Sequence, residues 1–259
     1  MSAPVWDTVV VDAPAEGVVR ITLNRPDAGN SLSSGLAADL AAALRWTRFE
    51  SAARAAVITG SGRFFCAGAD LKEREKPPWW LWDVRAAIDY VEQVEIPVIA
   101  AINGTCMGGG LELALATDIR VAGRTVKIGL PEITFGALPA AGGPARLARL
   151  VGPGRAKHLV FTGETFTGEQ AYAYGIAEIV VPDEEVIDRA VELASAVALN
   201  AGYASRTAKF VIDRGLHLPG SAALALEYSV IDTMADEEER AAAARAAMER
   251  STTYRKLLG

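Results

Sequence analysis

Histidine and cysteine are scarce, with two of each in 259 residues. Cys66 and Cys106 lie far apart and form no Cys-x-x-Cys pair, so the sequence predicts neither a disulfide framework nor a zinc site. His158 and His217 are too few for a histidine-rich metal site, and they offer little choice for a Ser-His-Asp triad. We therefore expect a protein that binds no metal.

Neither a long apolar run nor the pattern of a signal peptide is visible in the sequence. No run approaches the roughly 18 apolar residues of a membrane-spanning helix, and the N-terminal MSAPVWDTVV lacks the basic and apolar regions of a signal peptide. We expect a cytoplasmic protein with no membrane partner. A net charge of -6 argues against nucleic acid, because neutralising phosphates requires clustered Lys and Arg, although a few local cations suffice for a smaller anion.

The common phosphate and nucleophile motifs fail on spacing. Gly60 and Gly62 begin a G-x-G, but residue 65 is Phe, so the dinucleotide fingerprint is not met. The sequence has neither a GxxxxGK[ST] loop nor a G-x-S-x-G elbow. A nucleotide-binding P-loop and a serine hydrolase are both disfavoured.

Apolar periodicity predicts an α/β fold followed by a helical segment. Residues 18–23 alternate as a strand with Val19, Ile21 and Leu23 on one face, and Leu36, Leu40 and Leu44 have helical spacing. Further strands are expected at 55–59, 97–102, 119–122 and 126–128, and further helices at 77–95, opened by Pro77-Pro78, and at 111–116. After Gly142 the pattern is mainly helical, with a capping box at Thr167 and Gln170 and a C-cap at Gly175.

Two glycine-rich stretches each follow an apolar strand. They are VITGSGRFFCAGADLKE at 57–73 and PVIAAINGTCMGGGLELALATDIRVA at 97–122. Glycine lets the backbone approach a ligand closely and frees N–H groups to point at it. A ligand site between these stretches is the natural expectation.

Two carboxylates stand out near the glycines. Glu112 lies in the first turn of a predicted helix within apolar sequence, where burial is costly unless the charge is paired or functional. Glu132 follows Pro131 in a loop after a strand. The alternatives are that Glu112 only complements the helix dipole and that Glu132 is a solvated loop carboxylate.

Several segments together resemble the crotonase (enoyl-CoA hydratase/isomerase) superfamily over nearly the whole chain. They are ITLNRPDAGNSLS, FCAGADLKE, PVIAAINGTCMGGGLELALATDIRVA, GLPEITFGALPAAGG and LARLVGPGRAKHLVFTGE, in family order. The resemblance implies a spiral of ββα units with two near-perpendicular sheets in residues 1–195. It also implies a helical region at 196–259 that assembles a homotrimer or homohexamer. The substrate would be an acyl-CoA thioester, with no cofactor because coenzyme A is part of the substrate.

By motif position, the resemblance also assigns the site. The backbone N–H groups of Ala69 and Gly109 would form an oxyanion hole. Glu112 would activate the water that attacks Cβ, and Glu132 would supply a proton to Cα, although the pair acting in concert is an alternative.

Residues expected to bind the coenzyme A substrate follow from the same motifs. They are Arg25, Arg63, Cys66, Ala67, Asp70, Leu71, Lys72 and Ala140. Arg63 and Lys72 are equally well explained as surface charges. Ala140 departs from the glycine that hydratases commonly place there, which restricts the backbone at this position. Trp79, Trp80 and Trp82 fall in a segment that often lines the acyl pocket, but core packing is the favoured explanation.

The resemblance favours an enoyl-CoA hydratase, which adds water reversibly and syn to a 2-enoyl-CoA. Methylglutaconyl-CoA hydratase is an alternative, since ADLKER and GGGLELALATDIRVA resemble that group. An isomerase usually keeps only the carboxylate at the Glu132 position, so Glu112 argues against it. Decarboxylase and hydrolase members remain open because of Ala140. A non-enzymatic alternative is an inactive member that binds RNA or a protein partner.

Overall fold

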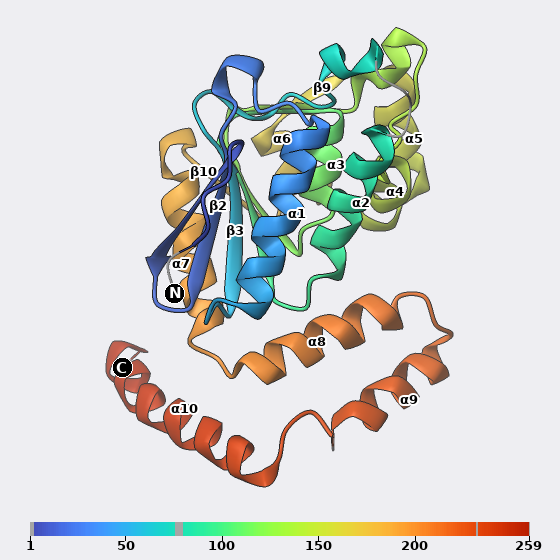
Figure 1. Cartoon of the computed structure of the whole chain (residues 1–259). Helices are drawn as coiled ribbons and strands as arrows, with labels where there is room; N and C mark the ends of the chain where they lie inside the picture. Colours follow the sequence, from blue (N-terminus) through green and yellow to red (C-terminus); the bar gives the residue numbers. More distant parts are fainter. Residues whose placement is uncertain (1–2, 76–79, 232, 259) are drawn as a thin grey trace.

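The computed structural model describes residues 3–75, 80–231 and 233–258 and contains two β-sheets (Figure 1). The larger sheet has the order β1 (Val9–Ala15), β2 (Val18–Leu23), β3 (Ala55–Gly60), β5 (Val98–Ile102), β7 (Ile119–Gly123) and β10 (Ile179–Val181). The smaller sheet has the order β4 (Phe64–Cys66), β6 (Thr105–Met107), β8 (Lys127–Gly129) and β9 (Thr165–Thr167).

The chain alternates between the two sheets. Each of the consecutive strand pairs β3–β4, β5–β6 and β7–β8 gives one strand to each sheet before the chain enters a helical segment. Within the large sheet β2, β3, β5, β7 and β10 run parallel, and β1 pairs antiparallel to β2. The predicted spiral of ββα units is therefore confirmed.

Helices cover both faces of the large sheet, which explains its nearly continuous apolar strands. Val19, Ile21 and Leu23 face the core shared with α1 (Ser34–Phe49) and α2 (Trp80–Gln93). On the opposite face, Val18 and Val57 pack in the cluster that includes α7 (Val186–Ala198). The predicted strand face at residues 18–23 is thus confirmed.

Further helical segments connect the strands. They are η1 (Pro26–Ala28), η2 (Leu71–Glu75), α3 (Gly109–Leu115), η3 (Pro131–Phe135), α4 (Gly143–Val151), α5 (Pro153–Thr162), α6 (Gly168–Tyr174) and η4 (Asp183–Glu185). The capping box of Thr167 and Gln170 and the left-handed Gly175 at the end of α6 are both present, as predicted.

Several elements differ from the prediction. The sequence did not indicate β1, β4, β6, β9 or β10; all but β1 are three residues long, too short to show a period of two. The predicted helix at 77–95 appears as α2, but Pro77, Pro78 and Trp79 lie outside the described residues. Trp80 is buried in the core, as favoured, whereas Trp82 is exposed.

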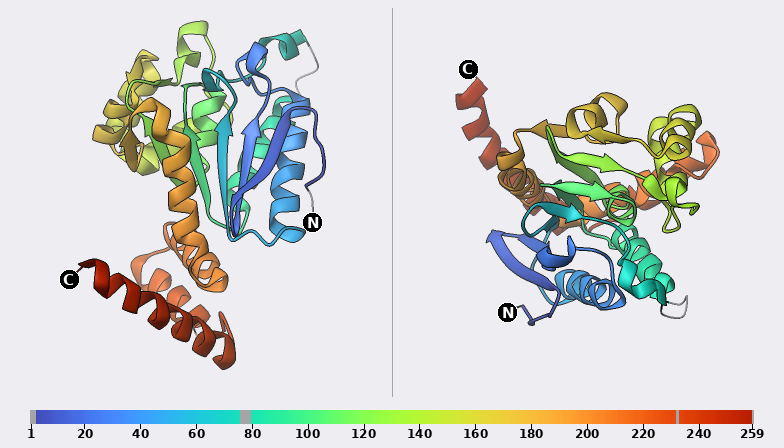
Figure 2. Two further views of the ribbon diagram at one scale, coloured as in Figure 1. Left: turned by 90° about the vertical axis from the view of Figure 1, so that its left-hand side faces the viewer. Right: turned by 90° about the horizontal axis from the view of Figure 1, so that it is seen from above.

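The last three helices form an arm that extends from the core (Figures 1 and 2). They are α8 (Gly202–Gly215), α9 (Gly220–Ile231) and α10 (Glu237–Leu258). Lys209 on α8 anchors the arm, because its Nζ donates to Asp118 Oδ2 at 2.8 Å and to the Ile96 carbonyl at 3.3 Å. No helix in the described part of the chain is both long enough and apolar enough to cross a membrane.

Candidate functional site

The loop after β4 meets the first turn of α3. Leu32 fixes the loop, because its N–H donates to the Gly68 carbonyl at 2.8 Å and its carbonyl accepts from the Asp70 N–H at 2.9 Å. Gly109 begins α3, and a Cβ built on it would lie 3.5 Å from the Ala69 nitrogen. The two predicted backbone donors, Ala69 and Gly109, therefore lie side by side.

Glycine is required where α3 meets this loop. A Cβ on Gly110 would lie 2.2 Å from the Cys66 carbonyl oxygen, which no side chain can tolerate. Gly68 has φ +101° and a built Cβ would lie 2.9 Å from the Met107 carbonyl oxygen. The glycine-rich pattern thus reflects backbone-to-backbone contact as well as room for a ligand.

Neither the Ala69 N–H nor the Gly109 N–H donates a hydrogen bond within the described part of the chain. The first N–H groups of an α-helix have no partner within the helix, and they carry its partial positive charge. Two adjacent amides without a partner in the described residues, one of them at the start of a helix, suit an oxygen that gains negative charge.

Glu112 is held by backbone amides. It is 3% exposed, and its Oε1 accepts from the Ala141 N–H at 2.7 Å and from the Gly143 N–H at 2.8 Å. Burial raises the pKa of this carboxyl above its ordinary value, while the two amides and the charges of Arg146 and Arg85 oppose the rise. The amides favour the ionised form, which is the form that can accept a proton.

Glu132 lies in a different environment. It sits in η3, and a Cβ built on Gly108 would lie 2.7 Å from its Oε1. Its Oε2 is buried and has no hydrogen-bond partner among the described residues. Burial and the nearby charge of Glu112 raise the pKa of Glu132 to about 7. A carboxyl of this kind is substantially protonated near neutral pH and can donate a proton.

Gly108 contacts both glutamates. Its carbonyl accepts the Glu112 N–H at 3.0 Å, and its Cα faces the Glu132 carboxylate. Gly108 has φ +53° and ψ -124°, a conformation that favours glycine. The structure therefore brings Glu112, Glu132, Ala69 and Gly109 around one glycine turn, and their catalytic roles stay predictions.

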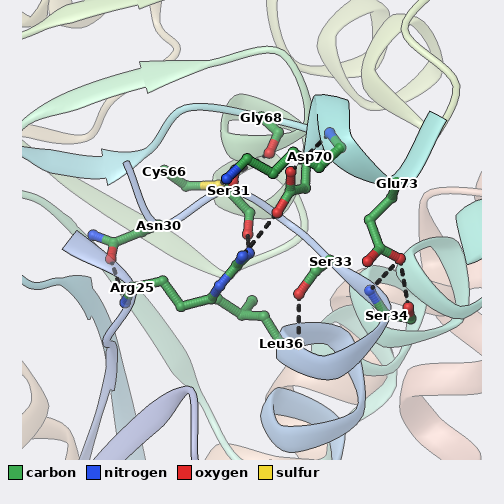
Figure 3. Close-up of polar contacts among 11 residues, drawn as sticks. Arg25, Asn30, Ser31, Ser33, Ser34, Leu36, Cys66, Gly68, Asp70 and Glu73 are labelled. Atoms are coloured by element: carbon green, nitrogen blue, oxygen red, sulfur yellow. Dashed lines mark hydrogen bonds and ion pairs between the residues drawn. The ribbon is translucent and has the colours of Figure 1, made fainter. Parts of the chain in front are cut away.

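Arg25 and Asp70 bind each other (Figure 3). Arg25 Nη2 donates to Asp70 Oδ2 at 2.8 Å, and Nη1 donates to the Ser31 carbonyl at 2.7 Å. Burial alone would raise the pKa of Asp70, but hydrogen bonds from Arg25 and the Lys72 amide outweigh it and lower the pKa. These two predicted coenzyme A residues thus also brace the loop that carries Ala69.

The other residues predicted to bind coenzyme A differ in their exposure to solvent. Cys66 is fully buried, backbone included, and burial raises the pKa of its thiol to about 12. Leu71 and Lys72 are exposed. Arg63 and Ala67 line a cavity of about 650 Å³ together with Gly29 and Phe64.

Ala140 directly precedes the residues of the loop whose amides bind the Glu112 carboxylate. Its carbonyl accepts from Arg85 Nε at 2.6 Å, and the next residue, Ala141, supplies one of the amides that bind Glu112. Sequence reasoning missed Arg85, Ala141, Gly143 and Arg146. A backbone amide has no signature in the side-chain pattern, so the sequence alone could not indicate Ala141 and Gly143.

Comparison with known proteins gives consistent results. A sequence model of the family described as enoyl-CoA hydratase/isomerase matches residues 14–255. The 2,3-dehydroadipyl-CoA hydratase of Escherichia coli is 38% identical, covering 86% of this chain and 89% of that protein. The enoyl-CoA isomerase/hydratase fer4 of Mycosarcoma maydis is 37% identical, covering 88% and 89%. A crystal structure of an enoyl-CoA hydratase from Bacillus anthracis superposes with a TM-score of 0.90 at 38% identity, covering 94% of this chain and 97% of that chain.

Proposed function

This chain belongs to the enoyl-CoA hydratase/isomerase family, and we propose that it acts as an enoyl-CoA hydratase. The family acts on acyl-CoA thioesters. The proposed reaction is the reversible syn addition of water to a 2-enoyl-CoA, which gives a 3-hydroxyacyl-CoA. No cofactor is needed beyond the coenzyme A that the substrate carries.

The observation that supports hydration most strongly is the pair of unlike carboxyls. Glu112 accepts two backbone N–H bonds, whereas the buried Glu132 Oε2 accepts none from the described residues. Hydration needs a base for water and an acid for carbon, and environments that separate two pKa values supply both. Double-bond migration requires only one group to move a proton between carbons, so retention of Glu112 favours hydration.

The reaction begins at the thioester oxygen. The amides of Ala69 and Gly109 would bind this oxygen and stabilise the negative charge that develops on it. One such donor is typically worth about 3 kcal/mol of transition-state stabilisation. Because neither amide donates to another described residue, neither must break a hydrogen bond to one of these residues to serve the substrate.

Proton transfer would then divide between the two glutamates. The Glu112 carboxylate takes a proton from water as the water oxygen bonds to Cβ, and the protonated Glu132 gives its proton to Cα. Each positioned acid or base typically contributes roughly 10²–10⁴-fold. One proton is held by the pair before and after the reaction, so its return from Glu112 to Glu132 resets the site.

The acyl specificity is a finer part of the proposal. Hydration of a branched acid, as in methylglutaconyl-CoA, uses the same groups, and the Escherichia coli relative is named for a substrate with a second carboxyl group. Isomerase activity is the second candidate, because the name of the Mycosarcoma maydis relative includes it. An inactive RNA-binding or partner-binding member is the non-enzymatic alternative.

Hydration of crotonyl-CoA tests the proposal. We expect the wild-type protein to remove the absorbance of the conjugated thioester, and Glu112→Gln and Glu132→Gln each to lose most of this activity while still binding a saturated acyl-CoA. Glu169→Gln, a change at an exposed residue of α6, is the matched control. Full activity in either site variant would contradict the two-carboxylate mechanism. No activity of the wild type on a panel of straight, branched and dicarboxylic enoyl-CoA esters would contradict hydration itself.

We also propose that the chain assembles into a homotrimer or homohexamer through its last three helices. The arm exposes large apolar side chains, as expected for helices that pack against other copies of the chain. They include Phe210, Ile212, Leu216, Leu224, Tyr228 and Ile231. We expect light scattering to give the mass of a trimer or hexamer, and a monomer at micromolar concentration would contradict this. Residues 196–259 as an oligomerisation region and the cytoplasmic location stay predictions.

A further inference from the structure

Polar side chains on one face of α2 hold the loop that carries the Glu112-binding amides. Arg85, Asp89 and Glu92 are spaced by four and three residues, so they lie on the same side of this helix. Arg85 binds the loop directly at Ala140, while Asp89 and Glu92 bind Arg146 on α4. None of these residues carries a role in the proposed reaction so far.

The contact of Arg85 continues to Glu112 through a single peptide group. Arg85 Nε donates to the Ala140 carbonyl oxygen at 2.6 Å. The N–H of the same peptide unit, which belongs to Ala141, donates to Glu112 Oε1 at 2.7 Å. A cation on the oxygen of a peptide group polarises its N–H, so hydrogen bonds in such a chain strengthen one another.

Arg146 holds the next part of the loop. Its Nη1 donates to the Ala141 carbonyl at 2.8 Å, and its Nη2 donates to Asp89 Oδ1 at 2.8 Å and Glu92 Oε2 at 2.6 Å. Arg146 crosses closely over Gly142, whose φ of +99° turns the chain into α4 and brings the Gly143 N–H to Glu112. Arg146 thereby fixes the loop whether or not Arg85 is present.

We propose that Arg85 is a positioning residue that holds Glu112 and keeps it ready to accept a proton, acting through the peptide group between Ala140 and Ala141. This inference rests on the proposed hydratase function, in which Glu112 is the base for water. Arg85 would therefore affect the water-activating step rather than the binding of the thioester.

The charges around Glu112 agree with this role. Arg85 on α2 and Arg146 on α4 favour its ionised form, and Glu132 on η3 lies close enough for the two carboxyl charges to interact. Loss of the Arg85 cation removes one of the two stabilising charges and weakens the hydrogen bond from the Ala141 amide, one of the two amides that bind Glu112 Oε1. Both effects act in the same direction and raise the pKa of Glu112.

The test is the pH profile of hydration in Arg85→Met. We expect kcat to fall about tenfold to a hundredfold, the range typical of partners that orient a functional side chain, with KM changed little. The acidic limb of the profile, where Glu112 must ionise, is expected to move to higher pH. Arg149→Met is the matched control, because Arg149 is an exposed arginine on α4.

Two further variants separate positioning from folding. Arg85→Lys keeps a cation that can reach the Ala140 carbonyl, and we expect it to recover part of the lost kcat and of the shifted limb. Arg85→Ala is expected to regain activity when guanidinium chloride is added at low millimolar concentration, but not with sodium chloride. If Arg85→Met is unfolded by circular dichroism, these two variants carry the test.

A titration independent of activity separates this inference from the proposed function. Carboxyl resonances of glutamate labelled with carbon-13 report the pKa of Glu112, assigned by its loss in Glu112→Gln. A higher pKa of Glu112 in Arg85→Met supports the positioning role even if the wild type hydrates no tested substrate. An unchanged pKa of Glu112 together with an unchanged acidic limb in Arg85→Met would overturn the inference even if the wild type is a hydratase.

Discussion

Glu112 and Glu132 are the same amino acid in two differently built regions. In the region around Glu112, amides from two residues of the 141–143 turn bind one carboxylate oxygen, and two arginines hold the loop from behind. The region around Glu132 is a short 3-10 helix that leaves a buried oxygen without a partner in the described residues. The surroundings, rather than the side chain, thus give the two carboxyls the different properties that the proposed base and acid require.

Each region depends on a glycine that touches its carboxylate. Gly108 faces Glu132 and Gly143 faces Glu112, with built Cβ atoms at 2.7 Å and 2.9 Å from the respective Oε1 atoms. Adding one methyl group at either position perturbs one carboxylate more than the other. The pair of variants therefore tests whether the two regions do different work.

Gly108→Ala is expected to have the largest effect. Its positive φ disfavours any other residue, and the added methyl group displaces Glu132 and disturbs the turn into Gly109. We expect kcat for crotonyl-CoA hydration to fall by about 10²-fold or more, since a displacement near 1 Å is enough for that loss. A variant that folds and keeps wild-type kcat would contradict the importance of this turn.

Gly143→Ala is expected to have a smaller effect. Gly143 starts α4, where alanine is tolerated, but the methyl group meets the Glu112 carboxylate. Because two amides and the loop can shift together by a few tenths of an ångström, we expect kcat to fall about tenfold, on the scale of a partial misplacement. The decrease should appear as a change in the acidic limb of the pH profile, and an unchanged limb would count against the assignment of Glu112 as base.

Glu132→Gln should stabilise the folded protein while it inactivates the enzyme. A carboxyl with an ordinary pKa of 4.5 that is raised to about 7 on folding binds extra protons in the folded state between these values. Stability therefore falls as pH rises through this interval, and a neutral amide removes the loss. We expect the Tm of Glu132→Gln to exceed that of the wild type by a few degrees at pH 8 and by less at pH 5. An equal difference at both pH values would contradict the raised pKa of Glu132.

Gly154→Ala is the smallest change and the reference for the glycine pair. Gly154 lies in α5, has no atom within 4 Å of a built Cβ and does not have a positive φ. Alanine in place of a helical glycine typically stabilises by about 0.5–1 kcal/mol. We expect a slight rise in Tm with unchanged kcat and KM, whereas a loss of activity would show that methyl groups anywhere on this scaffold are harmful.

Much of the architecture follows from local patterns in the chain. The strand at 18–23 and the helix that carries Leu36, Leu40 and Leu44 show their periods clearly, because each is long enough to display one. In the small sheet the sequence indicates β8, expected at 126–128, but not β4, β6 or β9, because three residues rarely display a period and their pairing is set by distant segments.

The site was predictable to the extent that side chains mark it. Glu112 stood out because a carboxylate within LELAL is costly to bury, and the glycines stood out by composition. The amides of Ala141 and Gly143 left no such mark, because every residue except proline carries an N–H. The contact of Arg85 with Ala140 joins residues 55 positions apart, so only the folded chain reveals it.

The division of labour between the two glutamates is tested most directly by exchange of the Cα protons of butyryl-CoA in deuterium oxide, followed by mass spectrometry. This saturated thioester forms the enolate but offers no alkene to hydrate, so the exchange isolates the group that serves Cα. We predict that Glu112→Gln still incorporates deuterium and that Glu132→Gln does not. Exchange that is lost in Glu112→Gln and kept in Glu132→Gln would contradict the account.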